Sequence, residues 1–592
     1  MPRTRKRAAS PEAEQPVDET MQESTNGLKF KEPLTWRYGK PIAVSDLLSR
    51  LKTLAEELAS IEQGDADRDS LVPKAQELAS AQLLAHRDKG VKAWTMLCIV
   101  EMFRLLAPDA PYKGGQLKQI FDIFISTIVP SLASPTDPYS QQYIAVLTSL
   151  TTIKSIILLT DIPGSDHLIL TLFNNCFDVM SGNMRSSHGE QLPKNVEYHM
   201  TNMLCTLVDE CEALPTGVVD IILAQFLRAD PNALSMGKKG EPQPSMVLRE
   251  VSPAHNMARS VCNTCADKMT RFVGQYFSSV LMDASETVAT SKSSRVRGKK
   301  RTRDGSDDES DDGLLTPPAE SDFDEVEKAH RLLRELWRSS PDVVRTIIPQ
   351  MEAEVSAENV QLRTMAIQTV GDMVSGIGAA GPPPPIPMDP AAYPSQSLDT
   401  TPASTQYQNV LLAPAAPHAF SAVYPSAYQG FVDRYRDKST QVRCAWATAV
   451  GRIICTSGGG KGLDAEQESL LLRHFSDMLQ DNDERVRLAA VRAIAQFDFN
   501  AIVQYLGSAG GVTTPGSPLC ILADRIKDKK ETIREEAMEL LGRIWGVAAG
   551  AIEEGSERLR EMLGPIPSKI LMAVYVNSAE TNALVQLSLI HI

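Results

Sequence analysis

A short motif that recurs three times in the C-terminal part of the chain constrains the fold more than any other feature. In each copy an acidic residue stands five positions before a Val or Ile, an Arg follows that residue directly, and an Ala comes three or four positions later. The copies are centred on Val442, Val486 and Ile533, which lie 44 and 47 residues apart. Each copy opens an apolar pattern of helical period, so one repeat is a helical hairpin. Such a hairpin cannot bury both of its faces alone, and the copies must therefore stack on one another.

Two-helix repeats of roughly 40–47 residues are typical of HEAT solenoids. Weaker copies of the motif occur at Glu358–Arg363 and at Asp88–Lys92, and no segment shows the alternation expected of strands. We therefore predict an all-α fold, a HEAT-repeat α-solenoid with a disordered N-terminus and two polar insertions. Because stacked repeats form one elongated body, the length of 592 residues does not imply several separate domains.

Composition divides the predicted solenoid into segments. Stretches rich in charge, or in Pro, Ala and Ser, carry too few large apolar residues to pack. The predicted boundaries are 1–27 for a disordered basic tail, 28–285 for N-terminal helical repeats, 286–322 for a disordered charged linker, 323–375 for further repeats, 376–427 for a disordered Pro-rich insertion, 428–586 for the C-terminal repeats, and 587–592 for residues that read as a sequencing artefact.

Net charge and cysteine usage limit the classes of protein to consider. The net charge of −14 argues against a grip on nucleic acid over the whole surface, although local basic patches remain open. The nine cysteines are scattered, and neither a secretion signal nor a run of about 18 apolar residues occurs, so we expect a reducing compartment and no membrane partner. Basic clusters at Arg3–Arg7 and Lys299–Arg303 are typical of nuclear import signals, with a solvated charged segment as the alternative.

Motifs for catalysis or metal binding are weak. Cys262–Cys265 is the only CxxC and lacks a second ligand pair, so we interpret it as buried structural thiols. The GxGxxG at Gly376–Gly381 follows a helix rather than a strand and runs into prolines, which predicts a flexible loop. Ser457–Gly462 has the Gly and Lys content of a phosphate loop without its spacing. We expect no enzyme activity, no catalytic residue, no metal and no firm cofactor site.

One group of cations stands out. Arg87, Lys89 and Lys92 surround the predicted start of a helix at Val91. Free backbone N–H groups at a helix N-terminus favour anions, and three cations would reinforce them. The alternative is a solvated edge of a repeat.

Several stretches of the chain resemble one family. They are LLSRLKTLAEELASIEQ (47–63), LLAHRDKGVKAW (83–94), APDAPY (107–112), VLTSLTTIKSIILLTDI (146–162), MARSVCNTCADKM (257–269) and HRLLRELWRSSPDVV (330–344). With them the chain resembles the precocious-dissociation-of-sisters proteins, which are HEAT-repeat regulators of cohesin. The resemblance runs to about Gln586, where the family continues with more repeats, so we expect a C-terminally truncated protein.

The resemblance implies a function and partners. It implies a nuclear, chromatin-associated scaffold without enzyme activity. Such a scaffold binds the cohesin kleisin subunit, the wings-apart-like release factor and the cohesion acetyltransferase, and regulates cohesin maintenance and release. It also implies that the hexapeptide docks short partner motifs, through Ala107, Pro108, Asp109, Ala110, Pro111 and Tyr112. An inositol polyphosphate near the N-terminal repeats is implied as well, and Arg87, Lys89 and Lys92 are compatible with it.

The residues themselves agree with a docking loop, because two prolines three positions apart stiffen the backbone and leave a preorganised dock with one Tyr. Two alternatives remain at this stage. One is a HEAT-repeat transport receptor or phosphatase-type scaffold unrelated to cohesin. The other is the helical part of a larger enzyme. The arginines that recur once per repeat, Arg443, Arg487 and Arg534, either brace neighbouring repeats or meet a partner, and we expect bracing.

Overall fold

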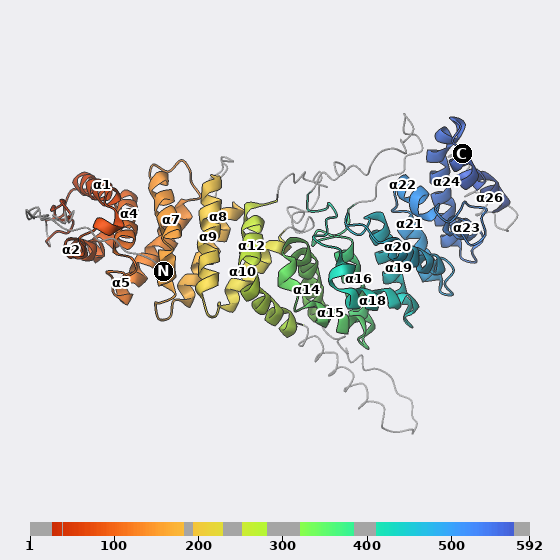
Figure 1. Cartoon of the computed structure of the whole chain (residues 1–592), viewed down its shortest axis with the longest axis horizontal. Coiled ribbons are helices and arrows are strands. Elements are labelled where there is room, and N and C mark those ends of the chain that lie inside the picture. The colour runs from red at the N-terminus through yellow and green to blue at the C-terminus, as the bar shows by residue number, and fades with distance from the viewer. Residues whose placement is uncertain are drawn as a thin grey trace, which may run out of the picture. The chain divides into compact units, whose positions relative to one another are not determined.

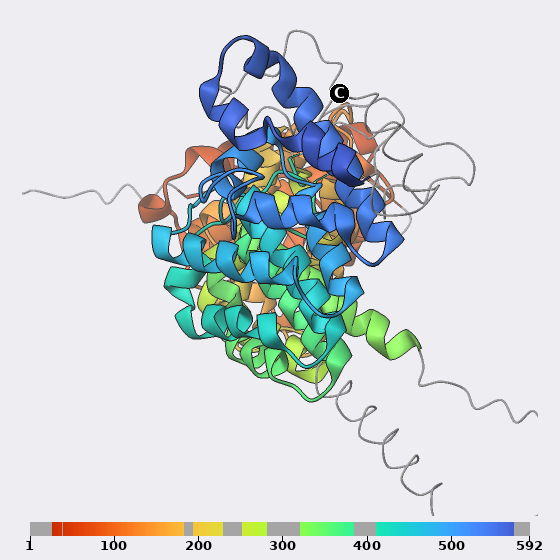
Figure 2. The same ribbon diagram turned by 90° about the vertical axis from the view of Figure 1, so that its right-hand side faces the viewer.

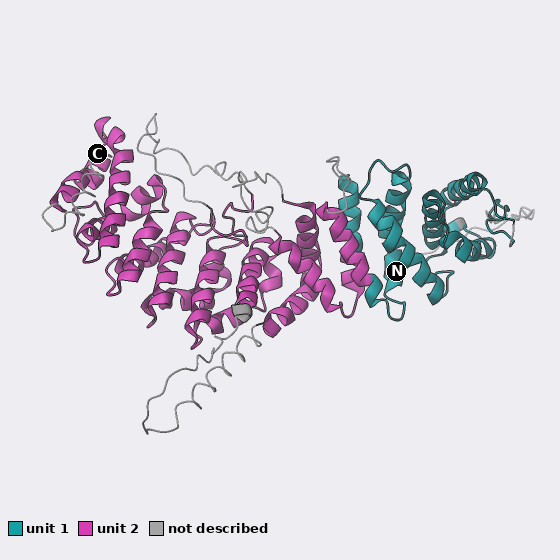
Figure 3. Cartoon of the chain, turned by 180° about the vertical axis from the view of Figure 1, so that it is seen from behind, with its two compact units in different colours: residues 1–168, 185–203 teal, residues 169–184, 204–592 magenta. Residues whose placement is uncertain are grey.

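A computed structural model describes residues 27–37, 40–182, 193–228, 251–280, 320–383 and 410–573. Within these ranges the regular elements are all helices, and Figure 1 shows their order along the chain. They form two compact units, residues 1–168 with 185–203 and residues 169–184 with 204–592 (Figure 3). The predicted tail apart from residue 27, nearly all of the predicted charged linker, and residues 574–592 lie outside the described residues.

The first unit is built around one long apolar helix, α4. This helix packs against α1 on one side and α7 on the other, and α2 and α3 also lie against it. Buried leucines at Leu47, Leu51, Leu54 and Leu58 show why α1 forms, since this spacing places them on one helix face. The helices of the unit are α1 (Val44–Ser60), α2 (Arg68–Leu78), α3 (Ala81–Leu84), α4 (Lys89–Leu106), α5 (Gly114–Ile123), α6 (Val129–Ser131), α7 (Ser140–Thr152) and the start of α9 (Lys194–Glu210).

The second unit repeats a helical hairpin. One layer is formed by α14, α16, α19, α21 and α24, each packed against the next, and helices such as α15, α18, α20 and α23 pack beside it. The all-α HEAT-repeat prediction is thereby confirmed. Figure 2 turns the view so that the blue C-terminal helices of this unit face the reader. The helices are α8 (Asp166–Ser181), α10 (Thr216–Leu227), α12 (Pro253–Thr264), α14 (Glu320–Ser339), α15 (Ile348–Val355), α16 (Val360–Val374), α17 (Phe420–Val423), α18 (Pro425–Asp433), α19 (Thr440–Cys455), α20 (Ala465–Met478), α21 (Glu484–Ile494), α22 (Phe499–Ala501), α23 (Pro518–Asp524), α24 (Glu531–Glu553), α25 (Glu557–Leu563) and α26 (Ile566–Met572).

The recurring arginines brace successive repeats. Arg443 donates from Nε and Nη2 to the carboxylate of Asp481 in the next repeat, at 2.9 and 3.1 Å. Arg487 does the same to Asp528, at 2.8 and 2.9 Å. Each arginine also uses Nη1 to hold the turn that precedes its own helix, as Arg443 does with the carbonyl of Asp437 at 2.8 Å. The expected bracing role therefore holds for these two arginines.

The hydrogen bonds of the acidic residue explain why the motif places it before the helix. Asp481 accepts from the N–H of Asp483 at 2.8 Å, and Asp528 accepts from that of Lys530 at 3.1 Å. One carboxylate thus closes the turn before its helix and receives the arginine of the preceding repeat. Arg534 makes the bond to its own turn, to the carbonyl of Asp528 at 3.0 Å.

The structure describes both ends of the predicted Pro-rich range 376–427, residues 376–383 and 410–427. Its two edges pack against the repeats, because the Gly376 carbonyl accepts from the Ala415 N–H and the Gly459 carbonyl from the Ala416 N–H, both at 3.0 Å. Gly376 has φ +67, and a Cβ there would lie 2.4 Å from the backbone nitrogen of Ala416. Arg338 holds the returning chain through the Val410 carbonyl at 2.6 Å.

The flexible loop predicted from the GxGxxG is therefore an ordered, packed turn. The prediction was wrong because the residues that cover it, such as Glu335 at 3.0 Å from the Ala379 N–H, lie far away in sequence. Residues 384–409 lie outside the described residues.

The thiols of the CxxC are buried, as interpreted. Cys262 and Cys265 are 0% and 5% exposed, and the Cys265 thiol donates to the Cys205 carbonyl at 3.3 Å. Within the described ranges, no three His, Cys, Asp or Glu side chains are grouped so that they could hold a metal ion.

None of the helices in the described part of the chain is both long and apolar enough to cross a membrane.

Candidate partner-docking site

The hexapeptide Ala107–Tyr112 forms the connection from α4 to α5. Side chains from the preceding hairpin hold its backbone: Gln63 donates to the Ala107 carbonyl at 3.2 Å, and Arg68 donates to the Leu106 carbonyl at 2.8 Å. Gln76 donates to the Pro111 carbonyl. These bonds all reach the main chain, so they help to fix the path of the loop. This agrees with the predicted stiff loop.

The side chains of the loop divide into exposed and buried groups. Pro108 and Asp109 are exposed, and the Asp109 carboxylate forms an ion pair of 3.1 Å with Arg68. Tyr112 is only 6% exposed and packs edge-on against Phe103, with ring centroids 5.5 Å apart. Burial raises the pKa of the Tyr112 hydroxyl, whose oxygen makes no hydrogen bond within the described residues.

Tyr112 thus anchors the loop to the core of the unit. A ligand that approaches from outside would meet Pro108 and Asp109. The sequence could not show this difference, because the burial of Tyr112 depends on how α4 presents Phe103.

The predicted cation cluster lies at the first turn of α4. Arg87 and Lys89 are exposed, Lys92 is half-buried, and none of the three side chains forms an ion pair or hydrogen bond with another residue of the described ranges. The helix N-terminus itself is occupied, because the Asp88 carboxylate accepts from the N–H of Val91 at 2.9 Å. An anion held here would therefore bind to the three side chains rather than to the backbone of the helix.

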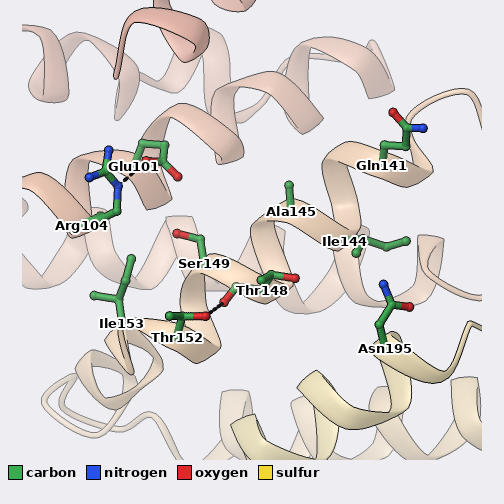
Figure 4. Close-up of a pocket in the computed structure, with 10 residues that line it drawn as sticks. All are labelled: Glu101, Arg104, Gln141, Ile144, Ala145, Thr148, Ser149, Thr152, Ile153 and Asn195. Carbon is green, nitrogen blue, oxygen red and sulfur yellow. Dashed lines mark hydrogen bonds and ion pairs between the residues drawn. The ribbon is translucent and has the colours of Figure 1, made fainter. Parts of the chain in front are cut away.

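A groove that sequence reasoning missed lies between α4, α7 and α9. It has a volume of about 580 Å³ and an uncharged floor that α7 provides, including Ile144, Ala145 and Thr148 (Figure 4). Glu101 and Arg104 form its wall. Arg104 donates to the Glu101 carboxylate at 2.6 Å and to the Leu58 carbonyl at 2.8 Å. The available signal was that α7, SQQYIAVLTSLTT, carries no charged residue although it has a solvent-facing side.

Comparison with known proteins gives the family. A model of the family described as "Sister chromatid cohesion protein PDS5 protein" matches residues 45–591. The chain belongs to this family. The PDS5 match extends beyond Gln586, where the resemblance read from the sequence ended. Family membership decides against the unrelated transport receptor and phosphatase-type scaffold.

Individual PDS5 relatives agree with the family match. The chain is 28% identical over 566 residues to the sister chromatid cohesion protein pds5 of Schizosaccharomyces pombe, covering 95% of the chain and 38% of that relative. It is 24% identical over 558 residues to PDS5 of Saccharomyces cerevisiae, covering 94% of the chain and 36% of that relative. The chain therefore spans less than two fifths of either yeast protein.

A solved structure shares the fold. It is described as "Structure of the Pds5-Scc1 complex and implications for cohesin function", and it aligns with a TM-score of 0.63 and 22% identity over 94% of this chain and 70% of that one. At this identity the likeness shows the fold alone. The residues of the hexapeptide and of the cation cluster are not tested by these comparisons, so their roles stay predictions.

Proposed function

We propose that this chain is a non-enzymatic scaffold that binds the kleisin subunit of cohesin and regulates the maintenance and release of cohesin in sister chromatid cohesion. Membership of the PDS5 family carries the proposal. The Arg443–Asp481 and Arg487–Asp528 pairs support it, because a scaffold must hold its repeats in a fixed relation to present one surface. A nuclear, chromatin-associated location follows from this function.

The Ala107–Tyr112 loop is the dock for short motifs of the release factor and the acetyltransferase in this proposal. Three side chains of the preceding hairpin pin its main chain, so little backbone entropy would be lost when a ligand binds. Its exposed residues, Pro108 and Asp109, would make the contacts. A basic residue of the ligand would compete with Arg68 for the Asp109 carboxylate.

A pull-down tests this division of labour. The chain would be mixed with a kleisin fragment and a release-factor fragment, as wild type and as Asp109→Lys. Kleisin capture should be unchanged. Release-factor capture should fall at least tenfold, because the substitution replaces a carboxylate that attracts a basic residue of the ligand by an ammonium group that repels it. Asp122→Lys on α5 is the matched control, since Asp122 is exposed and forms no ion pair within the described residues.

Tyr112→Ala is unsuitable as a test because it would leave a cavity in the core beneath the loop. Equal capture of the release factor by D109K and by the wild type would defeat the docking role. Loss of kleisin capture by the wild-type chain would defeat the scaffold function itself.

The Arg87, Lys89 and Lys92 cluster is the site of the inositol polyphosphate in this proposal. Its support is that three cations gather at one helical turn of a chain whose net charge is −14, and that no acidic side chain of the described residues forms an ion pair with them. Titration calorimetry with inositol hexakisphosphate should give binding that a triple Glu variant abolishes and that weakens as salt is raised. Unchanged binding by the triple variant would remove the assignment.

A further inference from the structure

The segment Leu28–Trp36, which we call the N-terminal arm, is bound like a peptide ligand. It has no helical structure and crosses α1, α2 and α3. Two of its side chains are buried four positions apart, Phe30 at 8% and Leu34 at 0% exposure. The arm precedes the first helix and belongs to no helical repeat. Its packing here is therefore not a consequence of the repeat pattern.

Side chains of the groove form hydrogen bonds with the main chain of the arm. The Glu77 carboxylate accepts from the N–H groups of Leu34 and Thr35, at 2.5 and 2.9 Å. The Gln82 amide pairs with both main-chain groups of Trp36: Gln82 Oε1 accepts from the N–H and Gln82 Nε2 donates to the carbonyl, each at 3.0 Å. Hydrogen bonds to the main chain with pockets for spaced side chains are how proteins bind extended peptides in general.

Two cations complete the groove. Lys74 donates to the Glu32 carbonyl at 3.0 Å and lies 5.3 Å from the centroid of the Phe30 ring. Arg50 of α1 donates to the Pro33 carbonyl at 2.7 Å. Arg50 also forms an ion pair of 3.0 Å with the Glu32 carboxylate. The two cations therefore contact main-chain carbonyls, one aromatic ring and one acidic side chain of the arm, and they set its path.

Helix α2 connects the groove to the hexapeptide loop. Ser70, Lys74 and Glu77 lie four and three positions apart on one side of α2 and bind the arm. Arg68 and Gln76, on another side, bind the loop.

The core holds α2 by only a few residues. Its buried side chains are Leu71, Ala75 and Leu78, so its position depends on the arm and on the loop as well as on the core.

We propose that the α1–α3 groove is a binding site for an extended peptide with an aromatic and an aliphatic side chain four positions apart, and that the N-terminal arm occupies it in cis. A partner segment of that chemistry exchanges with the arm. Occupancy of the groove fixes α2 and thereby the hexapeptide loop. The link to partner docking rests on the function proposed above, whereas the peptide site itself does not.

The arm competes with any added peptide for the groove, because it is part of the same chain. Residues 37–43 tether the arm to α1, and a short tether gives an effective concentration on the order of 1 mM, so a free peptide with a Kd of about 10 μM would be held back about 100-fold. The test therefore needs a chain whose arm is released.

The probe is a fluorescein-labelled peptide with the sequence of residues 27–37, GLKFKEPLTWR, and the assay is fluorescence anisotropy. The full chain with Leu34→Asp should bind it at least 30-fold more tightly than the wild-type chain, because a charge at a fully buried position expels the cis arm. The same chain with Glu77→Ala added should lose most of this gain. A peptide carrying L34D is the matched control and should not bind.

A second form of the chain guards against misfolding. A protease site inserted within residues 37–43 and cut after folding releases the arm without any change in the groove. If neither the cut chain nor a folded L34D chain binds the peptide more tightly than the wild type, or if the control peptide binds equally, the peptide site is refuted.

Hydrogen exchange tests the link to the loop. The amides of Asp109, Ala110 and Tyr112 should exchange at least tenfold faster in the L34D chain, and added peptide should restore them. Unchanged exchange would refute the link through α2. Because neither measurement uses a cohesin partner, their failure is distinguishable from failure of the docking function.

Discussion

Replacing Arg487 by Ala should open the solenoid locally. The guanidinium makes two hydrogen bonds to Asp528, at 2.8 and 2.9 Å, and one to the Asp481 carbonyl at 2.7 Å. The two side chains of the ion pair are 11% and 2% exposed, so solvent screens their attraction poorly. Removal of Arg487 leaves the buried carboxylate of Asp528 without its main partner.

The size of the effect follows from what Asp528 retains. Breaking a buried ion pair by removing one partner costs about 3–5 kcal/mol. Asp528 keeps an ion pair of 3.0 Å with Arg525 and the N–H of Lys530 at 3.1 Å, so the lower end applies. A loss of about 3 kcal/mol corresponds to an increase of about 150-fold in the equilibrium constant for local opening.

Hydrogen exchange of the amides in α21 and α24 measures this opening directly, because stacked repeats open locally rather than all at once. Arg485→Ala is the control, since Arg485 is 66% exposed and pairs with Asp483 of its own turn. Arg487→Lys should fall between the wild type and R487A, because an ammonium cannot bind a carboxylate through two parallel hydrogen bonds. Equal exchange in R487A and R485A would refute the bracing argument.

Three further predictions follow from close contacts and buried carboxylates. In Gly90→Ala the new Cβ would lie 2.4 Å from the Tyr139 ring, so we expect a loss of roughly 1–3 kcal/mol, seen as a lower melting temperature in circular dichroism. Burial raises the pKa of Glu354 to about 7, so its native state becomes less stable as pH rises from the ordinary carboxyl value through 7; Glu354→Gln should remove that loss between pH 5 and 8 in urea unfolding. Burial also acts to raise the pKa of Glu77, but hydrogen bonds from Lys74 and from the arm outweigh it and lower that pKa. Arm binding should therefore be complete above the ordinary carboxyl value and weaken as pH falls below it, which peptide anisotropy on the arm-released chain can follow; constant affinity down to pH 3 would contradict this.

The repeats could be predicted because each encodes its own contacts. The spacing from Asp481 to Val486 and Arg487 is fixed by a single turn and helix start, so it reappears as a sequence pattern wherever that turn is built. The same pattern left open what the arginine meets, since Asp528 belongs to the next copy. Stacking of the copies supplied that contact, and it resolved the choice between bracing and partner binding for Arg487 in favour of bracing.

Features that depend on distant residues could not be predicted. The N-terminal arm shows no periodicity, and Glu77 and Gln82, which bind it, carry no mark of that role in the sequence. The prolines predicted a stiff connection at Ala107–Tyr112, and the family resemblance predicted its docking role. The burial of Tyr112, however, depends on Phe103, and the path of the loop depends on α2. The groove along α7 is formed only when the neighbouring helices pack beside it, so the uncharged side of α7 did not by itself predict a groove.

The pinned edges of the Pro-rich insertion have a practical consequence. The Gly376–Ala415 and Gly459–Ala416 hydrogen bonds close the base of the segment 384–409 against the repeats. Added length between two pinned ends costs little, because the entropy of loop closure rises by only about 0.6 kcal/mol for each doubling of the length. This position is therefore suited to carrying a fluorescent reporter or an affinity tag inside the chain, with both termini and the N-terminal arm left untouched.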